Sequence, residues 1–279
     1  MKETVKLIIK GFLLGIANII PGVSGGTLAI TMGIYEDLIG AISHFFKNFK
    51  KNIQFLVPLG IGIVTSVLLM SKLISFCLDK FPFPTTLFFI GLIIGGIPLI
   101  FKKVKGVKLK PTNALLFLLT FGLIMLMTFL KEGNTVVSLA NISALQVFLL
   151  FLVGMVAAAT MVIPGVSGSF VLMLLGYYKP IVSTISNLTK FNLLGHNILV
   201  LAPFGIGVLV GIVLLAKLIE FLFSKYEVPT YYAILGFIVS SVVGLGIALI
   251  GTPLTLIQLI IGIILFILAS IIGYKLGDE

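Results

Sequence analysis

A short segment rich in proline, glycine and hydroxyl side chains occurs twice in this chain, each time within strongly apolar sequence. The first copy consists of Pro21, Gly22, Val23, Ser24, Gly25, Gly26 and Thr27, and the second of Pro164, Gly165, Val166, Ser167, Gly168 and Ser169. Proline together with several glycines cannot continue a helix. The helix that starts after each break carries unpaired backbone N–H groups at the positive end of its dipole, and the hydroxyl groups add donors. Each copy therefore predicts a site for an anion.

The alternative interpretation of each break is close helix packing, which small residues also permit in membranes. Two copies favour binding, because paired broken helices in the two halves of a chain are typical of transporters that hold substrate near the bilayer midplane. Asn18 and Thr160 precede the two breaks, and we expect them to line a cavity there.

Several charged side chains are further candidates for substrate binding or for coupling. Lys72 and Lys217 occupy equivalent positions in the two halves, where they either extend to the membrane interface or hold the charge of an anionic lipid headgroup. Glu220 follows Lys217 by one helical turn and can pair with it. Glu36 and Asp37 come after the first break; we expect solvated interface acids, and the alternative is that they carry a coupling proton.

Composition decides the class of protein. The chain has 279 residues, of which 59% are hydrophobic and 10% charged, with a mean hydropathy of +1.27. A soluble domain of this size cannot bury so much apolar surface, and apolar runs of roughly 17 to 25 residues, the length that spans a bilayer, recur along the chain. The lysines before the first run resemble a signal peptide, but no small-residue cleavage site follows, so we expect the run to be retained.

The sequence contains an internal duplication. Pro58-Leu59-Gly60 matches Pro203-Phe204-Gly205, and Pro84-Thr85 matches Pro229-Thr230. Apolar runs and breakers delimit matching segments in the two halves, at about 5–20, 26–43, 53–76, 85–101 and 113–130, and then at 143–163, 169–186, 198–223, 230–250 and 254–274.

These segments predict an all-α integral membrane protein made of two repeats, residues 1–132 and 133–279. In each repeat we expect a re-entrant broken-helix hairpin, at about 5–43 and 143–186, followed by three transmembrane helices. The alternative is that both members of each hairpin span the membrane. A repeat crosses an odd number of times in either case, so the two repeats must be inverted relative to each other.

Lysine and tyrosine positions predict the orientation. Lysines concentrate near the termini and in the connections at 44–52 and 102–110, which predicts that both termini lie in the cytoplasm of a bacterial cell and explains the net charge of +10 without nucleic acid. Tyrosines fall near predicted segment ends, where we expect their rings at headgroup level: Tyr35, Tyr177, Tyr178, Tyr226, Tyr231, Tyr232 and Tyr274. One cysteine and two histidines predict no metal site, and we expect no cofactor.

The paired motifs, with the Gly33-Ile34-Tyr35 and Gly176-Tyr177-Tyr178 that follow them, resemble the bacterial polyprenyl-phosphate transporter family over nearly the whole chain. The resemblance implies a lipid translocase rather than an enzyme. It implies that undecaprenyl phosphate, the carrier lipid of cell-wall synthesis, moves from the outer to the inner leaflet of the plasma membrane. The second copy has Ser169-Phe170 where the first has Gly26-Thr27, so the two sites differ chemically.

Two other functions remain open. The chain is distantly similar to undecaprenyl-diphosphate phosphatases, which follow a Pro-Gly-x-Ser turn with arginine and use a Glu-x-x-x-Glu pair. Here Gly25 and Gly168 follow the serine, and the sequence contains no arginine to stabilise a developing phosphoryl charge. A channel or carrier for a small anion is the other alternative.

The predicted orientation can be tested with single cysteines in a Cys77→Ser background. We expect Asn134→Cys to react with an impermeant maleimide added outside intact cells. Lys105→Cys should react only after permeabilisation, because the positive-inside rule places its connection in the cytoplasm. Labelling of Lys105→Cys in intact cells contradicts this orientation.

Overall fold

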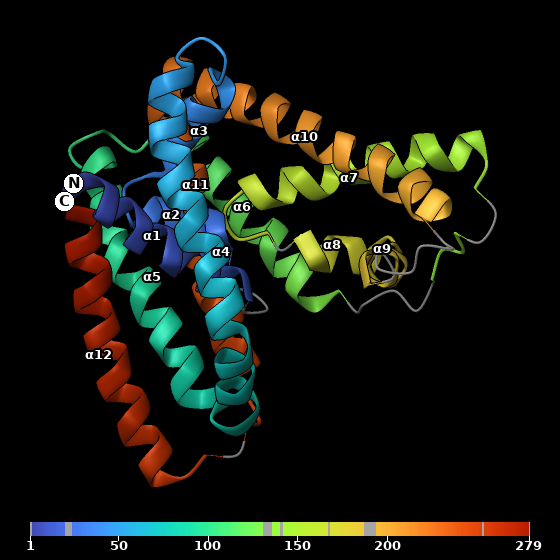
Figure 1. The fold of residues 1–279 in the computed structure, drawn as a ribbon. Helices are drawn as coiled ribbons and strands as arrows, with labels where there is room; N and C mark the ends of the chain where they lie inside the picture. The colour runs from blue at the N-terminus through green and yellow to red at the C-terminus, as the bar shows by residue number, and fades with distance from the viewer. Residues whose placement is uncertain are drawn as a thin grey trace.

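The computed structural model describes residues 2–19, 24–130, 136–139, 142–166, 168–186, 194–252 and 254–278, and all regular secondary structure within these ranges is helical. The helices are α1 (Lys2–Ile19), α2 (Gly25–Thr31), α3 (Tyr35–Ser43), α4 (Phe49–Lys80), α5 (Pro82–Val104), α6 (Pro111–Phe129), α7 (Ala144–Val162), α8 (Gly168–Leu174), α9 (Tyr178–Ser186), α10 (Leu194–Lys225), α11 (Glu227–Ala248) and α12 (Leu256–Asp278). Figure 1 shows their arrangement.

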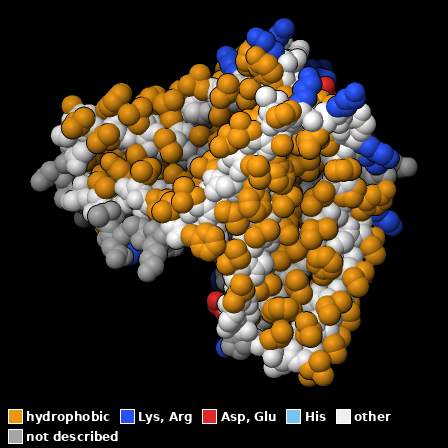
Figure 2. All heavy atoms as spheres, turned by 180° about the vertical axis from the view of Figure 1, so that it is seen from behind, with side chains coloured by type: hydrophobic (Ala, Val, Ile, Leu, Met, Phe, Trp, Pro, Cys, Tyr) orange, Lys and Arg blue, Asp and Glu red, His pale blue; other side chains and the backbone are white. Residues whose placement is uncertain are grey.

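Six helices in the described ranges are long and apolar enough to cross a membrane. They are α4, α5, α6, α10, α11 and α12, which form over the six segments that the sequence predicts to cross it. Large hydrophobic side chains cover the face of the molecule in Figure 2, and many of those on α10 and α12 are more than half exposed. The prediction of an all-helical, multi-pass membrane protein is confirmed.

The order and lengths of the helices repeat. α2 and α8 each contain 7 residues, α3 and α9 each contain 9, and α4 and α10 each contain 32. Helix pairing repeats as well: α1 packs against α4 as α7 packs against α10, and α5 packs against α12 as α11 packs against α6. The second kind of pair joins the two halves, so each half completes its packing with helices of the other.

The segments delimited at 26–43 and 169–186 each contain two helices, α2 with α3 and α8 with α9. Gly33 has φ of 67°; its N–H bonds to the carbonyl of Ile30, and the N–H of Ile34 bonds to the carbonyl of Ala29. This is the Schellman arrangement that ends a helix at a left-handed glycine. Gly176 repeats it, with φ of 76° and the corresponding bonds to Met173 and Leu172.

The two ends of the chain lie on the same side of the molecule. They are neighbours in Figure 1, and Glu3 of α1 and Gly277 of α12 line one cavity of about 230 Å³. Lysine side chains gather along the top and right edge of Figure 2, the side that also carries the α3–α4 and α5–α6 connections. In Figure 1, α5 and α12 run downward at the left and α7 and α10 extend to the right. The inversion of the two halves and the cytoplasmic position of the termini stay predictions from the sequence.

Glycines allow the close approach of α5 and α12. A methyl group on Gly91 would lie 2.4 Å from the backbone oxygen of Phe266, and one on Gly95 would lie 2.2 Å from that of Ser270. On the facing helix, a methyl group on Gly273 would lie 2.3 Å from the backbone oxygen of Leu92. Small residues that bring backbones together are a principal means of helix association in membranes, where lipid provides no hydrophobic drive.

We therefore expect Gly95→Ala to destabilise the protein by about 1–3 kcal/mol, because the added methyl group forces α5 and α12 apart. The matched control is Gly122→Ala on α6, where a methyl group meets no atom of the described chain within 4 Å. Thermal unfolding in detergent measures both variants. Equal melting temperatures contradict a tight α5–α12 contact.

Candidate functional site

The described parts of the two Pro-Gly segments contact each other. Ser24, which precedes α2, is buried, and its hydroxyl donates a long hydrogen bond of 3.5 Å to the carbonyl of Ile163. Gly26 packs against the same segment, the end of α7 and the residues after it. A methyl group on Gly26 would lie 3.0 Å from the backbone oxygen of Val162 and 3.4 Å from Pro164. The start of α2 therefore abuts the end of α7, and we call this contact the junction (residues 24–27 and 162–166).

Tyr35 fixes the junction from the side of α3. The ring is 4% exposed, and its hydroxyl donates to the carbonyl of Val162 at 3.0 Å. That carbonyl belongs to the last turn of α7, where carbonyls have no partner within the helix. Tyr35, Tyr177 and Tyr231 are buried in the protein, and the expectation that the tyrosines lie at headgroup level stays a prediction from the sequence. The turn at Gly33 contributes to the burial of Tyr35, because it redirects the chain into α3, which packs against α10.

The start of α2 has donors without a partner in the described protein. The side chain of Ser24 does not cap the helix, so the first N–H groups of α2 receive no acceptor from the residue at the N-cap. The hydroxyl of Thr27 is fully buried and makes no hydrogen bond to any described residue. A buried hydroxyl without a partner is costly. Asn18 lies beside this turn, since a methyl group on Gly25 would approach its Oδ1 to 2.7 Å.

The second copy packs against α11. Gly165 has φ of 80°, and a methyl group there would lie 2.7 Å from the hydroxyl of Ser241 and 3.0 Å from the backbone oxygen of Phe237. Pro164 and Val166 are buried, and Gly168 begins α8. Four site residues predicted from the sequence lie outside the described ranges, namely Pro21, Gly22, Val23 and Ser167. The side chain of Ser169 is also outside the description.

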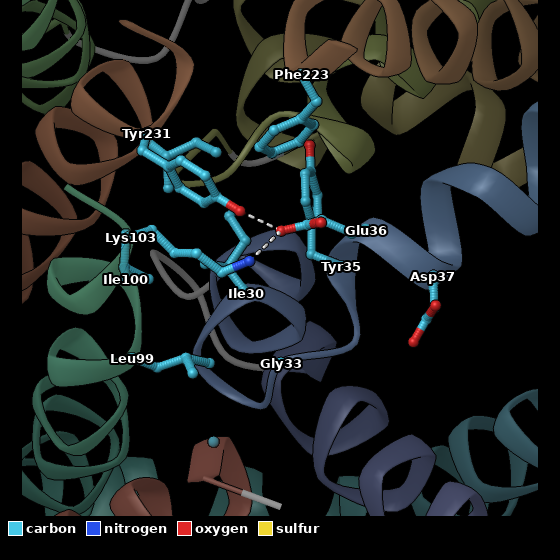
Figure 3. Close-up of a pocket in the computed structure, with 12 residues that line it drawn as sticks. Ile30, Gly33, Tyr35, Glu36, Asp37, Leu99, Ile100, Lys103, Phe223 and Tyr231 are labelled. Carbon is cyan, nitrogen blue, oxygen red and sulfur yellow. Dashed lines mark hydrogen bonds and ion pairs between the residues drawn. The ribbon is translucent and has the colours of Figure 1, made fainter. Parts of the chain in front are cut away.

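A cavity of about 260 Å³ adjoins the junction, with Tyr35 in its wall (Figure 3). The carboxylate of Glu36 accepts a hydrogen bond from the hydroxyl of Tyr231, and Lys103 Nζ lies 3.5 Å from the same carboxylate. The Lys103 ammonium also lies 5.5 Å from the centre of the Tyr231 ring. Asp37 points away from this group in Figure 3.

Sequence reasoning selected Glu36 but missed Lys103 and Tyr231. Nothing in the sequence links positions 36 and 231, because they meet only through the packing of α3, α5 and α11 around the cavity. The side chains of Lys103 and Glu36 are 45% and 56% exposed, so this ion pair is open to water and contributes little to stability. Its importance lies in placing a cation at the cavity wall.

The remaining candidates occupy different surroundings. Lys72 and Lys217 are exposed on α4 and α10. The expected pairing of Glu220 with Lys217 is replaced by contacts across the halves, because the end of α3 packs against α10. The carboxylate of Glu220 lies 3.1 Å from His44 Nδ1, and it accepts a hydrogen bond of 2.6 Å from Ser43.

Thr160 is buried, and its hydroxyl donates to the carbonyl of Ala157 within α7 at 2.6 Å. The hydroxyl is therefore engaged in its own helix. Its role in lining a cavity stays a prediction from the sequence.

We expect Tyr35→Phe to lower the free energy of unfolding by about 1–3 kcal/mol, since it removes the hydroxyl that satisfies the Val162 carbonyl. Tyr274→Phe on α12 is the control, because that side chain is 47% exposed. Thermal unfolding in detergent compares the two. A Tyr35→Phe variant as stable as the control shows that the junction does not need this bond.

Comparison with known proteins assigns the chain to a family. Residues 14–247 match the VCA0040-like family, which is described as undecaprenyl phosphate translocase-like. A polyprenyl-phosphate transporter of Staphylococcus aureus is 32% identical over 274 residues, covering 97% of this chain and 95% of that protein. A polyprenyl-phosphate transporter of Vibrio cholerae is 28% identical over 233 residues, covering 78% of this chain and 70% of that protein. No solved structure matches the chain. The family match spans most of the sequence, including both Pro-Gly segments, and the chain therefore belongs to the undecaprenyl phosphate translocase-like family.

Proposed function

We propose that this chain moves undecaprenyl phosphate, or a related polyprenyl phosphate, from the outer to the inner leaflet of the bacterial plasma membrane. This transport returns the carrier lipid to the side where cell-wall precursors are built. The family and the names of both relatives support the substrate. The observation that carries the proposal is the junction, where the two helix breaks meet in a buried, donor-rich contact.

In this proposal the phosphate head rests at the junction. A bare charge in the hydrocarbon core is very costly, so the protein must replace the water around the phosphate with fixed donors. The first N–H groups of α2 and the unpaired hydroxyl of Thr27 are donors of this kind. Ser24 adds a hydroxyl that holds only a long bond to Ile163, and it can turn to a phosphate oxygen.

Neutral donors suit a transporter because the head must leave as readily as it enters. The sequence contains no arginine, so a bidentate guanidinium clamp is absent from this chain. Lys103 places a cation at the cavity beside the junction, and its pairing with Glu36 weakens its attraction for a phosphate. We propose that the head passes this lysine between water and the junction, and that the isoprenoid chain stays in lipid.

The predicted inverted repeat gives this proposal a route between the two leaflets. If the two halves cross the membrane in opposite senses, one break opens toward each leaflet, and rocking of one half against the other exposes the junction to each side in turn. The repeated helix order and the pairing of α5 with α12 and of α11 with α6 support two related halves.

The hydroxyl of Thr27 gives a specific test. We expect Thr27→Val to lower transport of head-labelled undecaprenyl phosphate in proteoliposomes by roughly 10- to 100-fold, the loss of one hydrogen bond to a charged group. It should not lower the melting temperature, because this hydroxyl bonds to no described residue. The control is Thr31→Val on the same helix, whose hydroxyl bonds to the carbonyl of Leu28 and whose replacement should leave transport within about twofold.

The same assay separates the other functions. Release of inorganic phosphate from the lipid would show a phosphatase, and flux of small anions without lipid movement would show a channel or carrier. If Thr27→Val transports the lipid at the wild-type rate, the hydroxyl of Thr27 does not bind the phosphate during transport.

A further inference from the structure

A second, larger hollow lies on the opposite end of α3 from the junction. It has a volume of about 960 Å³ and runs between the α3–α4 connection and α10. Its wall is mainly apolar and includes Phe45, Phe46, Leu56, Leu209 and Val213. Phe46 is 89% exposed and Leu209 is 67% exposed, so the hollow is a groove open at the side of the molecule.

The charged groups of the groove favour an anion. Lys47 and Lys217 line it, together with Glu220 and His44. Glu220 is the acid of the set, and its carboxylate is held by Ser43 and lies 3.1 Å from His44 Nδ1. Within the described chain neither lysine makes an ion pair with it. The groove thus combines a long apolar wall with cationic charge, which is complementary to a lipid that has an isoprenoid tail and an anionic head.

We infer that this groove is a lateral binding site for polyprenyl phosphate, in which Phe46, Leu209 and Val213 contact the isoprenoid chain and Lys47 and Lys217 hold the phosphate. The inference rests on the proposed function and adds a second lipid site to it. It gives Lys217 a definite environment, beside an apolar surface that accommodates the tail.

α3 connects this groove with the cavity beside the junction. Glu36 near its start lines the cavity, and Ser43 at its end lines the groove, about 10 Å further along a helix with a rise of 1.5 Å per residue. On α10 the same relation holds, because Phe223 lines the cavity and Glu220 lines the groove. The groove and the cavity are therefore separated by about two turns of α3.

A tryptophan placed in the groove tests the site, because the natural chain contains none. Leu209→Trp puts the probe in the groove, and Leu214→Trp puts it on α10 at a leucine that is 53% exposed and does not line the groove. We expect undecaprenyl phosphate in detergent to change the emission of Leu209→Trp saturably and to leave Leu214→Trp without a saturable change. Val213→Trp repeats the test if Leu209→Trp fails to fold.

The headgroup contact is tested in the Leu209→Trp background. Lys217→Gln should weaken the apparent affinity for undecaprenyl phosphate by about tenfold, the loss of a bond to a charged group. Lys51→Gln, at an exposed lysine that follows the same connection but does not line the groove, should leave it unchanged. Undecaprenol should bind weakly, and inorganic phosphate alone should cause no change.

Each other outcome overturns the inference. Equal responses of the two tryptophan variants show that the groove holds no lipid. If undecaprenol binds as tightly as undecaprenyl phosphate, or if Lys217→Gln has no effect on affinity, the lysines do not bind the phosphate. An equal response to phosphatidylglycerol shows a general lipid surface. Transport assays on the same variants keep the two proposals apart: binding without transport contradicts the proposed function alone, and transport without a groove response contradicts this inference alone.

Discussion

Backbone N–H and C=O groups cannot find water in the hydrocarbon core of a membrane, and this constraint governs the centre of the molecule. The chain interrupts its helices at the Pro-Gly segments and again at Gly33 and Gly176. Every freed group must then be satisfied by protein or by a ligand. The glycine turns satisfy theirs through local backbone bonds. The Pro-Gly segments instead use the opposite half, through Ser24 and Tyr35. In the part of the junction that the structure describes, the buried hydroxyl of Thr27 has no hydrogen-bond partner, and the proposed function assigns it to the phosphate.

The helical class and the six long helices were predictable, because a bilayer requires long apolar runs and the sequence shows them directly. The interruptions between α1 and α2 and between α7 and α8 were predictable from proline and glycine chemistry. The turns at Gly33 and Gly176 were not recognised, although each glycine was part of a repeated motif. A single glycine within an apolar run is compatible with a membrane helix, and only the Schellman bonds distinguish a turn from a continued helix.

The cavity and the groove could not be predicted, because both depend on residues far apart in sequence. Glu36 meets Tyr231, and Glu220 meets His44, only after α3 has packed against α10 and α11. Local rules instead paired Glu220 with the lysine one turn away. The same rules placed Tyr35 and Tyr231 at the membrane interface. A tyrosine near a helix end satisfies its hydroxyl either with headgroups or with a carbonyl or carboxylate of the protein, and the sequence does not distinguish the two.

The exchange of partners between the halves has a consequence for biosynthesis. α5 is made early, yet its glycine face is covered by α12, which is made after the other described helices. The chain must therefore wait in the bilayer without this contact until α12 has been made, and neither half forms all of its helix contacts alone. A prematurely terminated product exposes an unpartnered surface that membrane quality control can recognise. If the protein arose by duplication of a shorter gene, the ancestral polypeptide would have needed a second copy of itself to cover the same face.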